Sequence, residues 1–299
     1  MRIHENINAV EVFSETRTKR PDWLKVRAPG GESYAEIRTL MRNKTLHTVC
    51  EEAHCPNIGE CWMHGTATFL ILGDVCTRSC GFCAVKTGKP PILDTEEPLR
   101  VAESVMNMKL HHAVITSVNR DELEDGGSSI WAETINEVRR LNPNTTIEVL
   151  IPDFKGDMIA VQRVIDASPD IFNHNVETIP RLYKTVRPQA KFERSLDVLR
   201  YAKYHGMRTK SGFMVGLGEE KEEIFEVLRF LKEANIDIVT IGQYLRPSKD
   251  HLPVARYVHP DEFSEYKQYG LGLGIEHIES APLVRSSYHA ERAVLDSRR

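Results

Sequence analysis

Apolar residues along this chain follow two alternating patterns from about residue 67 onward. Short runs rich in β-branched residues predict strands, and longer stretches with apolar residues on one helical face lie between them. Strands are predicted at residues 67–72, 112–116, 146–150, 170–174, 208–215 and 237–241. Helices are predicted at residues 98–110, 129–141, 158–166, 193–205 and 220–234, and one more at 34–44.

Six repeats of strand then helix predict a parallel sheet with its helices outside. Because right-handed crossovers curl such a sheet, we expect an α/β fold, a partial (β/α)6 TIM-like barrel. A doubly wound open sheet is the alternative, since the pattern does not decide whether the sheet closes. The expected divisions are a cysteine-rich N-terminal extension at 1–65, the barrel at 66–280 and a C-terminal tail at 281–299.

Charge and hydropathy exclude some classes of protein. A formal net charge of −4 argues against a broad nucleic-acid-binding face, which would be basic. No apolar stretch has the 18 or more residues of a membrane span, and the charged N-terminus lacks the apolar core of a signal peptide. We therefore expect a cytoplasmic protein, whose cysteines are thiols or metal ligands in a reducing compartment.

All six cysteines lie between residues 50 and 83, in two triplets. The triplets are Cys50-x4-Cys55-x5-Cys61 and Cys76-x3-Cys80-x2-Cys83. A zinc site or a four-iron cluster takes four ligands, so each triplet would leave one position open. The clustering of all six cysteines in one segment, and the lack of a signal segment, argue against a framework of disulfides. A zinc staple stays open, because His47, His54 or His64 offers a fourth ligand.

Polar residues follow the predicted strands at their carboxyl ends. They occupy 116–121 after the second strand, 173–177 after the fourth and 243–247 after the sixth. This is where a barrel enzyme carries its active site. For any single residue, a helix cap or a satisfied turn is the alternative.

The second triplet resembles the radical S-adenosylmethionine superfamily. It has that superfamily's C-x3-C-x2-C spacing, an aromatic residue (Phe82) before the last cysteine, and a position just after the first barrel strand. The resemblance implies that Cys76, Cys80 and Cys83 hold a catalytic [4Fe-4S] cluster and that S-adenosylmethionine chelates its fourth iron. An electron from this cluster would cleave the sulfonium and give a 5′-deoxyadenosyl radical.

Other segments resemble one family of that superfamily, lipoyl synthase. They are residues 47–62 around the first triplet, 173–178, 242–245 and 285–289, and the similarity runs from about residue 23 to the tail. The resemblance implies an auxiliary [4Fe-4S] cluster on Cys50, Cys55 and Cys61, with Ser287 as the fourth ligand, needed for catalysis. Spacing alone does not separate Ser287 from Ser286. The tail would close over the barrel mouth, fixed by Arg285 and Tyr288.

The implied reaction inserts sulfur at C6 and C8 of an octanoyl-lysine on a lipoyl carrier domain, with the auxiliary cluster as sulfur donor. Two S-adenosylmethionine molecules would be used per product. Implied partners are E2 subunits of 2-oxoacid dehydrogenases, the glycine cleavage H protein, an electron donor such as flavodoxin or ferredoxin, and an iron–sulfur cluster carrier, with no nucleic acid or membrane. The alternatives are another two-cluster radical enzyme, whose auxiliary cluster transfers electrons, and a non-catalytic zinc-stapled module.

Ten further residues are candidates for binding S-adenosylmethionine or the substrate amide. They are Phe82, Thr116, Ser117, Asn119, Asn173, Asn175, Glu177, Lys210, Gln243 and Arg246. Phe82 would offer its backbone to the adenine, and the planar fork of Arg246 would suit a carboxylate. The acidic segment 121–127 matches a calcium loop only by charge, so we interpret it as a solvated active-site loop.

Overall fold

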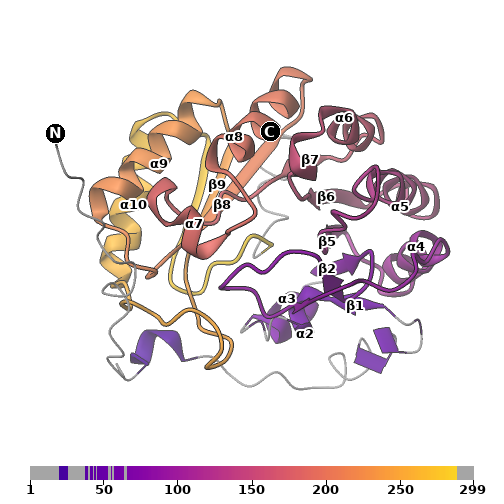
Figure 1. Cartoon of the computed structure of the whole chain (residues 1–299), viewed down its shortest axis with the longest axis horizontal. Helices are drawn as coiled ribbons and strands as arrows, with labels where there is room; N and C mark the ends of the chain where they lie inside the picture. The colour runs from indigo at the N-terminus through magenta and orange to yellow at the C-terminus, as the bar shows by residue number, and fades with distance from the viewer. Residues whose placement is uncertain are drawn as a thin grey trace, which may run out of the picture.

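One eight-stranded sheet organises the chain, with its helices outside (Figure 1). The computed structural model describes residues 20–25, 38–39, 41–42, 44, 46–52, 55, 57–63 and 66–287. The strands in this sheet are β1 (His47–Thr48), β2 (Thr66–Ile71), β5 (His112–Ser117), β6 (Thr146–Leu150), β7 (Ile171–Asn173), β8 (Thr209–Val215), β9 (Ile238–Gln243) and β10 (His277–Ser280). β1 pairs antiparallel with β2, and all other neighbours in this sheet are parallel.

Helices alternate with the strands along the chain. The longer ones are α4 (Glu97–Asn107), α5 (Ser128–Leu141), α6 (Met158–Asp166), α8 (Phe192–Tyr204), α9 (Lys221–Glu233) and α10 (Pro260–Gly272). Shorter elements are α2 (Val49–Glu52), α3 (Ile58–Met63), α7 (Tyr183–Val186), η2 (Asp22–Leu24), η3 (Phe154–Gly156) and η4 (Pro180–Leu182). A separate two-stranded sheet pairs β3 (Val75–Cys76) with β4 (Lys86–Thr87).

The expected α/β fold is confirmed, and all six predicted strands are present. The strands lie side by side in sequence order, from β2 to β10, without the reversal of a doubly wound sheet. The doubly wound alternative is therefore wrong. Within the described residues, β1 and β10 are the two edges, so this part of the chain forms an open sheet rather than a closed barrel.

One unit of the sheet differs from the sequence-based expectation. The unit α10–β10 was missed, because β10 is only four residues long and includes the polar residues His277 and Glu279. The first triplet includes two short helices, with Cys50 in α2 and Cys61 in α3. Residues 1–19 of the N-terminal extension, most of the predicted helix at 34–44 and the tail beyond residue 287 lie outside the described residues.

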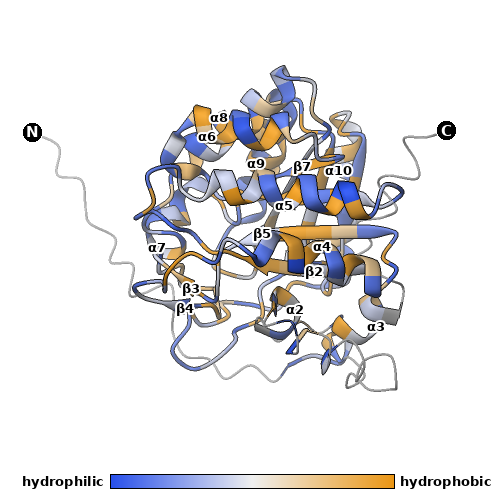
Figure 2. Cartoon of the chain, turned by 90° about the vertical axis from the view of Figure 1, so that its right-hand side faces the viewer, coloured by the Kyte–Doolittle hydropathy of each residue, from blue (hydrophilic) through white to orange (hydrophobic). Residues whose placement is uncertain are grey.

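The sheet presents an apolar face to the helices. Phe69, Ile115 and Val149, from β2, β5 and β6, pack in one buried cluster with Trp131 of α5. Figure 2 shows apolar β2 and β5 beside α4 and α5, whose visible faces are largely hydrophilic. A second cluster joins β8, β9 and β10 to α8, α9 and α10. Burial of these apolar faces is the main stabilising contribution to the fold.

Residues on the opposite face of the strands include buried polar groups. Glu148, Asn173 and Lys210 come from β6, β7 and β8, and Glu148 accepts hydrogen bonds from the other two. Side chains alternate between the two faces of a strand, so an apolar outer face leaves these groups inside the curl of the sheet. The interior is therefore partly polar.

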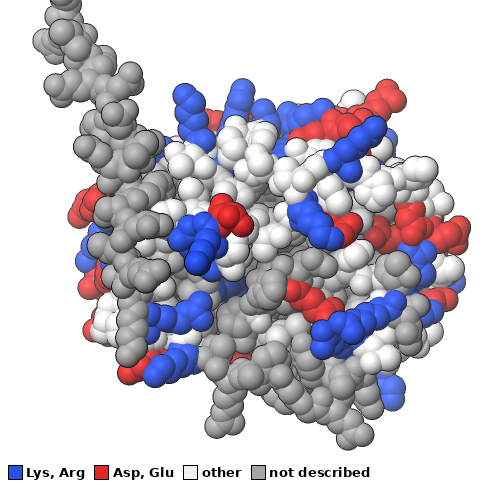
Figure 3. All heavy atoms as spheres, turned by 60° about the horizontal axis from the view of Figure 1, so that its bottom comes forward, with Lys and Arg blue, Asp and Glu red and all other residues white. Residues whose placement is uncertain are grey.

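Acidic and basic side chains are interspersed on the face seen in Figure 3. Among the described residues, no helix combines the length and the hydrophobicity needed to cross a bilayer.

Candidate functional site

The second cysteine triplet lies on a loop tied down by backbone hydrogen bonds. Cys76 ends β3, and the Cys83 amide donates to the Cys80 carbonyl oxygen over 3.1 Å. The Gly81 amide donates to the Val186 carbonyl oxygen over 2.9 Å, and the Leu252 amide donates to the Gly81 carbonyl oxygen over 3.0 Å. The loop is therefore held between α7 and the segment that follows β9.

Three thiols converge on this loop. Cys76, Cys80 and Cys83 are free, half-buried, and close enough to influence one another electrostatically. Burial raises the pKa of Cys80, and it raises the pKa of Cys83 to about 12. Such thiols stay protonated unless a positive charge compensates the thiolates, and thiolates are the ligands of iron–sulfur clusters. The three thiols are the donor type of such a cluster, although no three described side chains are gathered in the geometry of a bound metal ion.

Asn119 contacts the first of these sulfurs. Its backbone amide donates to Cys76 Sγ over 3.3 Å, and its side-chain Nδ2 lies 3.8 Å from the same atom. Hydrogen bonds of this kind orient a metal-binding sulfur and help to set the reduction potential of a cluster. Asn119 was predicted to contact the cofactor, and the structure brings it against a predicted cluster ligand.

A buried ion-pair network anchors the loop to the sheet. Arg78 donates to Asp121 over 2.7 and 2.9 Å and lies 2.6 Å from Asp153, which also pairs with Arg194 at 3.2 Å. Burial alone would raise the pKa of Asp153, but Arg78 outweighs burial and lowers this pKa to about 2. Arg78 therefore fixes the loop two residues from Cys76, beside the segments that follow β5 and β6.

The segment at 281–287 crosses the end of β9 and meets the cysteine-rich extension. The Gln243 amide donates to the Pro282 carbonyl oxygen over 3.3 Å. A Cβ on Gly242 would lie 2.1 Å from the Val284 carbonyl oxygen, so a larger residue would displace the tail. Asn57 Nδ2 donates to the Leu283 carbonyl oxygen over 2.7 Å, which joins the tail to the segment of the first triplet.

Two side chains of the tail extend this contact. Asn175 Nδ2 donates to Ser286 Oγ over 2.7 Å, linking the tail to the segment after β7. Burial raises the pKa of Cys55, while the positive charge of Arg285 acts in the opposite direction on that pKa. The tail thus lies beside the first triplet as well as the barrel rim. The Cys50 side chain and Tyr288 lie outside the part that the structure describes.

Several of the ten predicted contact residues do lie near the second triplet. The negative charge of Glu177 acts on the pKa of Cys80 and Cys83, and burial raises the pKa of Glu177 itself. Asn175 Nδ2 also donates to Glu177 over 3.1 Å. The other side-chain atom, Asn175 Oδ1, is buried and has no hydrogen-bond partner among the described residues. Phe82 lies on the loop itself and packs against the second apolar cluster. An acceptor without a donor is a place for a ligand.

Two other candidate residues have hydrogen-bond partners within the protein, and a third has none among the described residues. Thr116 Oγ1 donates to the Leu150 carbonyl oxygen over 2.8 Å, whereas Ser117 Oγ is buried without a partner in the described chain. Asn173 Nδ2 donates to Glu148 over 3.0 Å.

Three further candidate residues have polar partners within the protein. Lys210 is the second residue of β8 rather than a strand-end group, and its ammonium is 2.9 Å from Glu148. The Gln243 side-chain amide bonds to backbone groups of Tyr244, Arg256 and Val258. Arg246 donates to the carbonyl oxygens of His251 and Lys249. Their polar groups act within the protein, a use that only the folded chain reveals.

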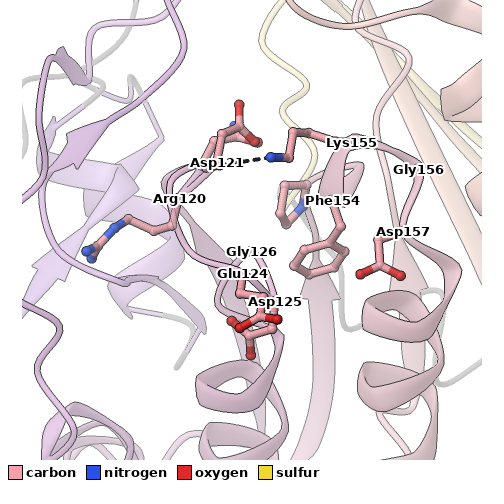
Figure 4. Close-up of a pocket in the computed structure, with 11 residues that line it drawn as sticks. Arg120, Asp121, Glu124, Asp125, Gly126, Phe154, Lys155, Gly156 and Asp157 are labelled. Carbon is pink, nitrogen blue, oxygen red and sulfur yellow. Dashed lines mark hydrogen bonds between the residues drawn. The ribbon is translucent and has the colours of Figure 1, made fainter.

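A cavity of about 300 Å³ lies between the loops that follow β5 and β6 (Figure 4). Asp121, Asp125, Lys155 and Asp157 are among its lining residues, and Lys155 Nζ donates to the Asp121 carbonyl oxygen over 2.9 Å. The acidic segment at 121–127 therefore lines a polar hollow beside the Arg78 network. Asp125 also accepts from the amide of Ser129 over 2.9 Å, so it satisfies a backbone donor in the first turn of α5.

Sequence reasoning missed several residues that hold the cysteine loop. His251 Nε2 lies 2.9 Å from the Cys83 carbonyl oxygen, and Arg187 lies close enough to Cys80 to affect its pKa. Arg78 was inside the motif but was assigned no role. No local pattern distinguishes these residues, because each acts on a segment far away in the sequence.

Comparisons with known proteins show the family of the chain. A family model described as the radical SAM superfamily matches residues 70–231. A second, the N-terminal domain of lipoyl synthase of that family, matches residues 4–55. A lipoyl synthase from Rubrobacter xylanophilus is 64% identical over 95% of this chain and 89% of its own length. A mitochondrial lipoyl synthase from Nematostella vectensis is 56% identical, over 93% of this chain and 96% of its own length.

Solved structures share the fold at low sequence identity. Streptococcus suis SuiB bound to S-adenosylmethionine aligns with a TM-score of 0.56 at 12% identity, over 83% of this chain and 61% of that one. Methylornithine synthase aligns with a TM-score of 0.51 at 14% identity, over 88% of this chain and 92% of its own length. Family models, relatives and geometry agree: the chain belongs to the lipoyl synthase family and is a radical S-adenosylmethionine sulfurtransferase that uses a [4Fe-4S] cluster.

Proposed function

We propose that this chain inserts sulfur at C6 and C8 of an octanoyl-lysine held on a lipoyl carrier domain. The observation that carries the proposal is the tail at 281–287, which contacts the segment of the first triplet and the barrel rim. It meets the first triplet's segment through Asn57 and Leu283, and it meets the barrel rim through Asn175 and Ser286. A sulfur donor and a radical generator would then serve one substrate in one place.

Two bound groups would supply the chemistry. S-adenosylmethionine with the reduced cluster on Cys76, Cys80 and Cys83 would supply a radical able to break an unactivated C–H bond, and a second cluster would supply sulfide. An acid or base on the protein could not do this, because an alkyl C–H bond is not acidic enough for a side chain to deprotonate. Two such events, one at each carbon, would require two S-adenosylmethionine molecules per product.

The chain's own residues would position these groups. Asn119 would orient Cys76, Arg78 would fix the loop, and the tail would hold the second cluster against the barrel mouth. Cys50, Cys55 and Cys61 would be the sulfur ligands of the auxiliary cluster. We assign its fourth ligand to Ser287, because Ser286 Oγ is already engaged by Asn175. Serine is a hard oxygen ligand and holds iron of a sulfide cluster less firmly than thiolate does. A weakly held iron suits a cluster that gives up its sulfide.

The proposed partners follow from the reaction. They are octanoylated lipoyl domains of 2-oxoacid dehydrogenase E2 subunits and the glycine cleavage H protein, an electron donor such as flavodoxin or ferredoxin, and an iron–sulfur carrier that rebuilds the spent cluster. We propose action in the cytoplasm, where a reducing environment keeps cysteine ligands available.

Matched serine variants test the proposal. Ser287→Ala and its control Ser286→Ala are reconstituted anaerobically with isotopically heavy sulfide, then incubated with an octanoyl-lysine peptide, S-adenosylmethionine and dithionite. We expect Ser287→Ala to form 5′-deoxyadenosine but no sulfur-containing product. We expect Ser286→Ala to retain sulfur insertion, because it loses only one hydrogen bond of about 1 kcal/mol.

The mass of the peptide decides between the candidate functions. Two heavy sulfurs in the product of the unaltered chain support the auxiliary cluster as donor. Unlabelled sulfur, or a peptide without sulfur, contradicts that role and favours a cluster that only transfers electrons. If Ser287→Ala inserts sulfur normally while Ser286→Ala does not, the two serines have been assigned in the wrong order.

A further inference from the structure

Arg187 is a half-buried cation near the second triplet. It follows α7, and its Nη1 donates to the Asn175 carbonyl oxygen over 2.9 Å and to Tyr183 Oη over 3.2 Å. Its Nε is buried and has no hydrogen-bond partner among the described residues, and none of their carboxylates forms an ion pair with it. A buried N–H donor without a partner is rare and calls for an explanation.

The guanidinium lies next to Cys80 in the fold. The Gly81 amide donates to the Val186 carbonyl oxygen over 2.9 Å, so the residues that directly follow Cys80 and directly precede Arg187 are hydrogen-bonded. The charge of Arg187 also interacts electrostatically with Cys80. A cation held at this place favours negative charge on the sulfurs of the loop.

A directed chain of hydrogen bonds holds Arg187 in place. Arg187 donates to Tyr183 Oη, and Tyr183 Oη donates to Ser195 Oγ over 3.3 Å. Ser195 Oγ lies 3.0 Å from His174 Nε2, and His174 Nδ1 lies 2.8 Å from the Ile151 carbonyl oxygen. Every atom has a suitable partner if His174 is neutral with its proton on Nδ1. Burial, the first cause, lowers the pKa of His174 to about 4, which keeps it neutral at physiological pH.

We propose that Arg187 is a positioning residue that keeps a fixed positive charge beside Cys80 and so makes the cluster on Cys76, Cys80 and Cys83 easier to reduce. Reduction adds one negative charge to the cluster, and a nearby cation in a poorly solvated site stabilises that charge. Charge and hydrogen bonds around the sulfurs are known determinants of cluster potentials. The inference rests on these cysteines holding the cluster, as the proposed function requires, but not on which substrate is used.

The test measures the cluster and not turnover alone. Arg187→Gln removes the charge, Arg187→Lys keeps it, and Arg181→Gln is the control. Arg181 is an exposed arginine six positions earlier, whose guanidinium pairs with Glu223 at 2.7 Å. Each change is made in the full-length chain with all three cysteines of the first triplet replaced by alanine, so that one cluster remains. Iron per chain is determined first, and the cluster is then titrated with a reductant and followed by electron paramagnetic resonance.

We expect Arg187→Gln to lower the equilibrium constant for reduction about tenfold, which is a shift of about 59 mV for one electron. Arg187→Lys should shift it less, and Arg181→Gln should not shift it. An unchanged potential in iron-loaded Arg187→Gln overturns the proposal. The proposal is also overturned if Arg187→Gln changes the affinity for S-adenosylmethionine but not the reduction potential. Arg187 would then be a ligand for the carboxylate of S-adenosylmethionine.

A second variant keeps the test decisive if Arg187→Gln does not load iron. Tyr183→Phe removes the hydroxyl that accepts from Arg187 and leaves the charge in the chain. A smaller shift in the same direction supports a role for the fixed position of the charge. A fully loaded Tyr183→Phe chain with the unaltered potential, together with an iron-free Arg187→Gln chain, contradicts the proposal and leaves Arg187 a purely structural role.

Discussion

Replacing Lys210 by methionine should destabilise the protein in a way that grows with pH. The Lys210 ammonium lies 2.9 and 3.0 Å from the two carboxylate oxygens of Glu148, and both side chains are at most 2% exposed. Removing one partner of a buried pair leaves an uncompensated charge, which typically lowers the free energy of unfolding by about 3–5 kcal/mol. His112 Nε2 is 3.7 Å from Glu148 and offsets only part of this.

The pH dependence follows from Glu148. Burial acts to raise its pKa, but Lys210 and His112 outweigh burial and hold the pKa at about 2, below the ordinary value of 4.5. In the unaltered chain this carboxylate therefore contributes stability that is present above pH 4.5 and is lost as the pH falls toward 2. Without Lys210, we expect burial to dominate and to raise the folded-state pKa of Glu148 above its ordinary value of 4.5. The variant then loses stability as the pH rises, because the unfolded chain gives up this proton first.

Urea unfolding of the iron-loaded chain at pH values of about 5, 6.5 and 8, followed by circular dichroism under anaerobic conditions, measures the difference. We expect the deficit of Lys210→Met to be smallest at the lowest of these pH values and largest at the highest. The double variant Lys210→Met with Glu148→Gln should recover most of it, since no buried charge remains. Lys203→Met is the control, because its pair with Asp237 is partly exposed and should contribute at most about 1 kcal/mol. A deficit that does not vary with pH, or a double variant less stable than the single one, would refute this reasoning.

Two further predictions concern the tail and a helix cap. Gly242→Ala should displace the tail, since its Cβ would lie 2.1 Å from the Val284 carbonyl oxygen, and iron per chain should fall from about eight to about four. Gly272→Ala, whose Cβ would meet nothing within 4 Å, should keep all its iron, and equal iron in both variants contradicts the prediction. Asp157 accepts from the Ile159 amide over 2.9 Å at the start of α6, so Asp157→Ala should lower the free energy of unfolding by about 1 kcal/mol. Urea denaturation measures this loss, and an unchanged midpoint would show that this cap contributes nothing.

The sequence predicts this fold well where the pattern is local. Strands such as β5 and β9 are short runs rich in apolar residues, and the neighbouring helices carry apolar residues at helical spacing, so both were found. β10 was not found, because a four-residue edge strand with polar positions has no periodicity to recognise. The second triplet was recognisable for a related reason, since its three sulfur ligands lie within about eight residues of one another.

The supporting residues could not be predicted, because their partners are distant in the sequence. Arg246 and Gln243 follow a strand, as active-site residues do, but they bind backbone carbonyl oxygens that only the folded loop presents. Arg187 has no motif at all, and its place is set by the contact of α7 with the cysteine loop. Composition and spacing identify ligand types, whereas the surroundings of each ligand depend on contacts formed by folding.

The contact between Asn57 and Leu283 joins residues 226 positions apart. It can therefore form only late in synthesis, long after the first triplet has been made. A ribosome that has made both cysteine triplets has yet to add the segment that covers the first of them. A nascent or prematurely terminated polypeptide would expose that region to solvent and oxidants. The iron that we propose to bind there would therefore be enclosed only after residues 281–287 have been synthesised.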